Sequence, residues 1–183
     1  MYITKSDKTV TAKLDITAKC VVECLKKHCA TLSTAESCTG GLLSGAITSV
    51  SGASEVFELG VCSYSCRIKN EILGVDNELI EKFGVVSSQV AEEMAKGVRK
   101  LSGADVGVGI TGIAGPTGAC EGKPIGTVYV CVVKDEIFDV RNLRLYDEFE
   151  GLTRDDVRQL TVLKAFEMIC GLFGDNVNES ISE

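Results

Sequence analysis

Several residue types are scarce in this 183-residue sequence: it has one histidine, no tryptophan and two prolines. Chemistry that requires two histidines is therefore excluded. The single histidine, His28, lies near the end of an expected helix (14–30) that precedes a strand, so the base for a serine nucleophile should be sought elsewhere. No apolar run approaches the roughly 18 residues that a membrane span needs, and residues 1–13 lack the apolar core of a secretory signal. We expect no membrane partner.

Nine cysteines are present, but no two of them form a Cys-x-x-Cys pair. With a single histidine to assist them, their spacing does not offer a zinc-binding cluster. An odd number of cysteines scattered through apolar segments is typical of reduced thiols that serve as small core residues. Reduced thiols in turn indicate a cytoplasmic protein.

Length and charge limit the classes of protein further. The sequence is 45% hydrophobic, which predicts one ordinary globular domain. Its net charge of -7 argues against nucleic acid or an anionic membrane as a partner. We expect a folded domain over 14–173, with a disordered leader (1–13) and a disordered tail (174–183).

Residues 34–45 carry the most informative pattern. A short buried strand (31–35) leads over Gly40 and Gly41 into a helix, so several backbone N–H groups at the helix start should face outward and attract an anion or a developing oxyanion. Ser37 would present its hydroxyl at the same place. The alternative is a plain strand–helix turn in which Ser37 or Thr39 only caps the helix.

A second strand (57–64) ends at Tyr64 and leads into a helix (65–73) that carries Lys69 in its first turns. Both side chains are expected at the edge of the sheet where Ser37 lies. A desolvated lysine loses affinity for its proton and becomes a plausible general base. The alternatives are a solvated helix charge for Lys69 and an interfacial ring for Tyr64.

A third strand (104–110) runs into a loop (111–118) with three glycines, a proline and two threonines. This loop resembles a ligand-binding turn but has neither the Walker pattern nor the dinucleotide-binding glycine spacing; a simple long turn is the alternative. A hairpin (127–145) follows, and then a helix (155–173). Arg154 and Arg158 stand one turn apart at the start of this helix, which indicates an anionic ligand or ordinary pairing with neighbouring aspartates.

Five motifs together are more specific than any one of them, and in order and spacing they resemble the CinA C-terminal domain family. They are Ala-Glu-Ser-Cys-Thr-Gly-Gly (35–41), Val-Cys-Ser-Tyr-Ser-Cys-Arg-Ile-Lys (61–69), Phe-Gly-Val-Val-Ser (83–87), Thr-Gly-Ile-Ala-Gly-Pro (111–116) and Lys-Pro-Ile-Gly-Thr-Val (123–128). The resemblance covers about residues 14–173. It implies an α/β fold, a three-layer α/β/α sandwich around a mixed, largely parallel sheet. The chain resembles the stand-alone form of the family.

The resemblance further implies a homo-oligomer without a metal that hydrolyses the carboxamide of nicotinamide mononucleotide to nicotinate mononucleotide and ammonia. We expect no cofactor. By position, Ser37 matches the family's nucleophile and Lys69 the lysine paired with it, while Tyr64 and Thr111 match supporting polar residues. The expected substrate-binding residues are Cys38, Thr39, Gly40, Gly41, Gly112, Gly115 and Arg154.

Two positions depart from the family pattern. The asparagine that usually follows Tyr-Ser is Cys66 here, and one extra residue precedes Arg154 and Arg158. Three other functions remain as alternatives: an inactive nucleotide-binding module, an amidohydrolase for another small amide, and an oligomeric scaffold.

Overall fold

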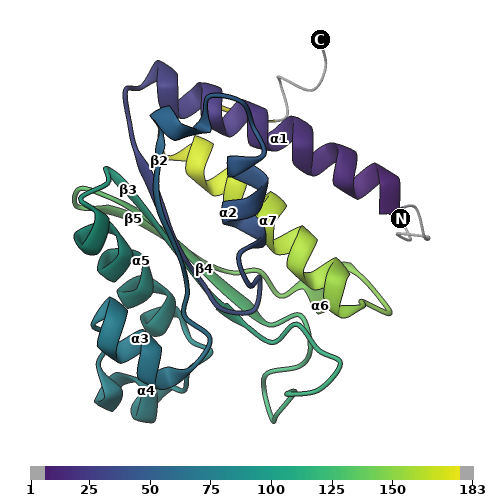
Figure 1. Ribbon diagram of the computed structural model, residues 1–183. Coiled ribbons are helices and arrows are strands. Elements are labelled where there is room, and N and C mark those ends of the chain that lie inside the picture. The colour runs from purple at the N-terminus through teal and green to yellow at the C-terminus, as the bar shows by residue number, and fades with distance from the viewer. Residues whose placement is uncertain (1–6, 178–183) are drawn as a thin grey trace.

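A single five-stranded sheet forms the centre of residues 7–177, the part of the chain that the computed structural model describes (Figure 1). The strands lie in the order β2-β1-β3-β4-β5, and β1 pairs in parallel with both β2 and β3. Only β4 runs against its two neighbours, β3 and β5. The strands are β1 (Leu32–Glu36), β2 (Phe57–Cys62), β3 (Val106–Gly112), β4 (Val128–Lys134) and β5 (Ile137–Asn142). The predicted mixed, largely parallel sheet is confirmed.

Helices cover both faces of this sheet, which gives the predicted three layers (Figure 1). One layer contains α1 (Asp7–Lys27), α2 (Leu42–Thr48) and α7 (Arg154–Gly171). The other layer contains α3 (Cys66–Leu73), α4 (Asn77–Phe83) and α5 (Ser88–Ser102). A 3₁₀ turn, η1 (Ala53–Glu55), and a short helix, α6 (Leu145–Glu148), lie in the connections. Among the described helices, none is both long and apolar enough to cross a membrane.

Side-chain caps define where four of the helices begin. Ser65, Asp76 and Ser87 accept backbone N–H groups at the starts of α3, α4 and α5. Thr153 and Asp156 form a reciprocal capping box at the start of α7. Such caps satisfy N–H groups that have no partner within the helix, so these boundaries follow from the sequence itself.

Glycines let the α5 layer approach the sheet closely. A Cβ on Gly107 of β3 would lie 2.3 Å from the carbonyl oxygen of Ala95, and one on Gly109 would lie 2.1 Å from that of Ala91. Helix α5 itself carries Gly97, where a Cβ would lie 2.0 Å from the carbonyl oxygen of Leu73, the last residue of α3. The close approach at the β3 glycines is therefore made by helix α5, and α3 rests directly against α5.

Some boundary predictions were wrong. Helix α1 begins at Asp7, so residues 7–13 are helical rather than part of a disordered leader; residues 1–6 lie outside the described part of the chain. At the other end, Asp175 pairs with α1 and Val177 is buried, so 174–177 pack on the fold. The rest of the expected tail, 178–183, is again outside the described residues. Strand β5 ends at Asn142, and the Leu145 backbone turns into α6.

All nine cysteines are free thiols. Four of them, Cys24, Cys38, Cys131 and Cys170, are buried as small core residues, as expected. Four others are exposed: Cys29, Cys62, Cys66 and Cys120. The prediction of a core role was therefore too broad.

Candidate active site

The carboxyl ends of β1, β2 and β3 meet at one edge of the sheet because these strands are parallel. Ser37 directly follows β1, Ser63 and Tyr64 follow β2, and Thr111 lies near the end of β3. The Ser37 N–H donates to the carbonyl of Ile110, and the Ser63 N–H donates to that of Glu36. The first residues after the strands are thus tied together. This is the edge at which open α/β sheets bind ligands.

Lys69 and Ser37 are neighbours at this edge, as predicted. The Lys69 Nζ lies 3.1 Å from the Ser37 Oγ and 2.5 Å from the Ser63 carbonyl oxygen, to which it donates. Lys69 is fully buried, whereas Ser37 is partly exposed. The pair therefore consists of an amine shielded from water and a hydroxyl that a ligand can reach.

No carboxylate in the described part of the chain forms an ion pair with Lys69. Burial lowers the pKa of Lys69 below its usual 10.5, while the nearby Cys66 and Cys38 thiols oppose this shift. Desolvation disfavours the charged form of an amine when no opposite charge compensates for it. Burial therefore shifts the equilibrium of Lys69 toward its neutral, proton-accepting form. Because the side chain is buried, the alternative of a solvated helix charge is wrong.

Glu36, to which the sequence pattern assigns no role, occupies the start of α2. Its buried carboxylate accepts the backbone N–H groups of Gly41, Leu43 and Ser44 at 2.9–3.1 Å, and the Ser44 hydroxyl at 2.6 Å. The N–H of Gly40 is also occupied, by the Ser37 carbonyl. The expectation that these N–H groups face outward toward a ligand was wrong: an internal carboxylate satisfies them. The only sequence signal was an acidic residue directly before a glycine turn.

The backbone N–H groups of Cys38 and Thr39 lie in the same turn and do not donate to Glu36. Both lie against the Cys38 thiol, a weak acceptor, and burial raises the pKa of that thiol to about 12. The Thr39 hydroxyl is also buried and has no hydrogen-bond partner in the described structure. Polar groups able to turn toward a bound molecule are thus present directly after Ser37.

Tyr64 and Thr111 lie at the same edge, but neither hydrogen-bonds to Ser37 or Lys69. The Thr111 hydroxyl donates to the carbonyl of Val85 at 2.8 Å, which ties the end of β3 to the loop before α5. Tyr64 is 66% exposed, and its hydroxyl lies 2.9 Å from the guanidinium of Arg154. Their contacts are with the start of α7 and with the loop before α5, and a direct catalytic role for either stays a prediction.

Both arginines at the start of α7 point into this edge despite the extra residue before them. Arg154 donates to the carbonyl of Gly115 at 2.8 Å as well as contacting Tyr64. Arg158 donates twice to the Thr39 carbonyl, at 3.0 and 3.2 Å, and pairs with Asp155. The two cations therefore connect α7 to both glycine-containing loops, beside the partly exposed Ser37.

The predicted substrate-binding glycines differ in surroundings. Gly40, Gly41 and Gly115 have positive φ angles of 61°, 90° and 82°, which favour glycine. At Gly112 an added Cβ would lie 2.7 Å from the Val128 side chain, so its lack of a side chain serves strand packing. Contact of these glycines with substrate, like that of Cys38 and Thr39, stays a prediction.

Comparison with known proteins identifies the family. The model of the CinA C-terminal domain matches residues 14–173. A competence-damage inducible protein of Acetivibrio thermocellus is 50% identical over 139 residues, which are 76% of this chain and 32% of that protein. A CinA-like protein of Thermotoga maritima is 44% identical over 147 residues, 80% of this chain and 35% of that protein. The chain thus spans about a third of the length of these relatives.

A solved structure agrees with the sequence comparison. The crystal structure of the competence/damage inducible protein CihA from Agrobacterium tumefaciens superposes with a TM-score of 0.83 at 34% identity, over 88% of this chain and 96% of that one. The family match therefore extends through all three layers and includes Ser37, Lys69 and both arginines. On both sequence and fold, this chain belongs to the CinA C-terminal domain family.

Proposed function

We propose that this chain is a nicotinamide-nucleotide amidohydrolase that converts the carboxamide of nicotinamide mononucleotide into a carboxylate and ammonia. The observation that carries the proposal is the contact between a fully buried lysine without a carboxylate partner and a partly exposed serine, 3.1 Å apart. An uncharged amine at hydrogen-bond distance is the base that a serine nucleophile needs when histidine is not at hand.

The first half of the reaction forms an acyl-enzyme. Neutral Lys69 accepts the hydroxyl proton of Ser37 while the Ser37 Oγ attacks the carboxamide carbon, and the carbonyl oxygen takes the negative charge. In this proposal the backbone N–H groups of Cys38 and Thr39, now against a thiol, hold that oxygen. Protonated Lys69 then gives its proton to the departing nitrogen, the C–N bond breaks, and ammonia leaves.

The second half releases the product. Lys69, neutral again, accepts a proton from water as the water oxygen attacks the acyl carbon. The bond to Ser37 Oγ breaks and the proton returns to the serine, which leaves nicotinate mononucleotide and free enzyme. The Ser63 carbonyl, 2.5 Å from the Lys69 Nζ, keeps the amine directed at Ser37 in both halves.

Charge favours an anionic nucleotide at this edge. Arg154 and Arg158 present guanidinium groups beside the loops that follow β1 and β3. A guanidinium binds phosphate oxygens through paired N–H groups, and Arg158 is already partly neutralised by Asp155. Arg154, whose described contacts are both neutral, is the stronger candidate for the 5′-phosphate.

The direct test is ammonia release from nicotinamide mononucleotide by the purified chain and by Ser37→Ala and Lys69→Ala. Both variants should lose activity by about 10³-fold or more while keeping the far-UV circular dichroism of the parent. Ser49→Ala and Lys96→Ala are matched controls, because both side chains are exposed and their polar partners are Ala46 of α2 and two glutamates of α5. A Ser37→Ala enzyme at near-normal rate would exclude the assigned nucleophile.

The same experiment separates the alternatives. An inactive nucleotide-binding module would release no ammonia but would still be stabilised by the mononucleotide, by about 2.7 kcal/mol at 100 times its Kd. An amidohydrolase for another small amide would release ammonia from a different member of a substrate panel, again with dependence on Ser37 and Lys69.

A further inference from the structure

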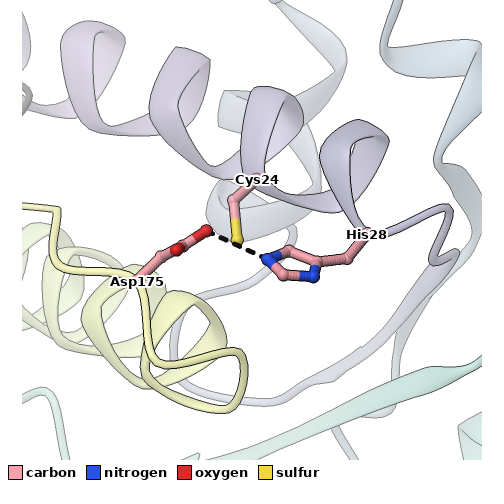
Figure 2. A group of neighbouring side chains, drawn as sticks. All are labelled: Cys24, His28 and Asp175. Carbon is pink, nitrogen blue, oxygen red and sulfur yellow. Dashed lines mark hydrogen bonds and ion pairs between the residues drawn. The ribbon is translucent and has the colours of Figure 1, made fainter.

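A second group of reactive side chains gathers where α1 and α7 end, away from the candidate active site. Figure 2 shows Cys24 and His28 of the α1 end facing Asp175, which follows α7. One ligand atom from each, the Cys24 Sγ, a ring nitrogen of His28 and a carboxylate oxygen of Asp175, all lie within 4.8 Å of one another. The His28 Nε2 and the Asp175 Oδ2 are 3.1 Å apart.

Helix geometry explains why these three residues converge. Cys24 and His28 are four residues apart, one helical turn, and the His28 N–H still donates to the Cys24 carbonyl at 3.1 Å. The Asp175 N–H donates to the carbonyl of Cys170 at the end of α7, so the chain folds back there. Helices α1 and α7 pack together in one layer, which brings the two ends side by side.

The imidazole is already oriented toward this point. Its ring stacks on Phe173 with centroids 4.6 Å apart and an angle of 19° between the rings. Cys24 is buried, whereas His28 and Asp175 are only partly covered, with 31% and 29% of their side chains exposed. Fixed ligands with one solvent-facing side lose little freedom on binding an ion and leave it a route in.

The surroundings supply further ligand atoms. A pocket of about 380 Å³ adjoins the cluster and is lined by Cys20, Cys24 and Cys170 together with Glu23 and Asp175. The Cys170 thiol lies beside that of Cys24. A fourth ligand, either this thiol or water from the pocket, is therefore within reach.

Thiolate, imidazole and carboxylate together are the ligand types of zinc. Calcium and magnesium prefer oxygen ligands alone, and sulfur disfavours them. A tetrahedral zinc ion with bonds of about 2.0–2.3 Å holds its ligands roughly 3.3–3.8 Å apart, so a contraction of about 1 Å from the separation seen here suffices.

We propose that Cys24, His28 and Asp175 form a binding site for one zinc ion, with the fourth position open to the Cys170 thiol or water. The site fastens the segment after α7 to α1. Sequence spacing did not offer this cluster, because its third member lies some 150 residues from the other two and in a segment expected to be disordered.

The ion competes with a lysine for Asp175. Lys27 donates to both carboxylate oxygens, at 2.9 and 3.1 Å, and is 64% exposed. An exposed ion pair contributes little and its lysine can swing into water. If the cluster is a zinc site, removing the Lys27 charge tightens zinc binding. If it is only an ion-pair network, neither the parent nor the Lys27 variant binds zinc.

The zinc site is separate from the catalytic edge. Helix α7 has 18 residues, about 27 Å of length, with Arg154 and Arg158 at one end and Cys170 at the other. We therefore expect zinc to raise the melting temperature, Tm, by about 5–10 °C at 100 times its Kd, with ammonia release unchanged within twofold.

The test titrates the full-length, metal-free chain with Co²⁺ as a spectroscopic substitute for zinc, and then displaces it with Zn²⁺. The parent should show a thiolate-to-cobalt charge-transfer band that saturates at one equivalent. Cys24→Ser should abolish the band if water is the fourth ligand, or halve it if the Cys170 thiol is. His28→Gln and Asp175→Asn should each weaken binding at least tenfold. Lys27→Gln should strengthen it, and Cys170→Ser should halve the band if that thiol is the fourth ligand or leave it intact if water is.

Cys120→Ser is the matched control, since that thiol is exposed in a distant loop and should not affect the band. Circular dichroism melts of each metal-free variant confirm folding. A parent without a saturable band, or a band of equal strength in Cys24→Ser, overturns the proposal. A parent chain that releases no ammonia would contradict the proposed function alone, because the cobalt band does not depend on that activity.

Discussion

Lys69 and Lys27 lie in two regions of this molecule that shift the pKa of a lysine in opposite directions. At the carboxyl edge of the sheet, burial without a carboxylate lowers the pKa of Lys69. At the end of α1, the hydrogen-bonded carboxylate of Asp175 raises the pKa of the exposed Lys27. The difference teaches that burial without a nearby carboxylate lowers the pKa of a lysine and favours its use as a base, whereas a neighbouring carboxylate raises the pKa and keeps the lysine a cation.

The largest expected effect comes from removing each amine. Lys69→Met should lower kcat/KM for the mononucleotide by about 10³-fold, because Ser37 loses its base. Its Tm should be unchanged or higher, since a buried amine without a carboxylate partner is replaced by an apolar side chain of similar volume. Lys27→Met should leave kcat/KM unchanged. Steady-state ammonia release and thermal melts measure both, and equal losses in the two variants would erase the contrast.

Next comes the pH dependence. Below the pKa of Lys69 the amine is protonated, so kcat/KM should rise about tenfold per pH unit as the pH increases toward that pKa. Above it the rate should be constant, and the change should occur at a pH lower than 10.5. Between the folded pKa and 10.5 the unfolded chain binds more protons, so the free energy of unfolding should also rise with pH. A pH–rate profile and pH-dependent melts test this, and Lys69→Met should lack that contribution to the rise in stability.

A smaller effect should follow from supplying the missing anion. Cys66 is exposed at the first position of α3, and its side chain is close enough to influence the pKa of Lys69. Cys66→Asp should raise the pKa of Lys69, move the rise of the pH–rate profile upward by about one unit, and lower the rate at pH 7 about tenfold. Cys66→Asn, the residue usual in the family, is the uncharged control and should leave the profile in place.

The smallest effect is expected at the Lys27 pair. Breaking it by Lys27→Met should lower the Tm of the metal-free chain by about 2 °C or less, because exposed ion pairs contribute little. Salt should reduce even this difference. Melts at low and high ionic strength measure this difference. A fall of 10 °C would mean that the Lys27–Asp175 pair stabilises the fold strongly, in contrast to the Lys69 amine.

Sequence reasoning reached the Ser37–Lys69 contact because parallel strands bring their carboxyl ends to one edge and both residues follow such strands. It did not reach the role of Glu36, since an acidic residue beside a glycine turn can face either the ligand or its own helix. Nor did it reach the partners of Tyr64 and Asp175, because those contacts depend on how distant helix ends pack. Patterns along the chain specify strand ends well and the meeting of helix ends poorly.

Gly97 lies outside the candidate active site, yet it packs against the helix that carries Lys69. The last carbonyl of α3 occupies the space that a methyl group at Gly97 would need, and Lys69 sits one turn earlier on that helix. We expect that a methyl group at Gly97 would push α3 away from α5 and lengthen the distance between the Lys69 amine and the Ser37 hydroxyl. The absence of a side chain at Gly97 of α5 thus allows α3 to hold Lys69 where it is.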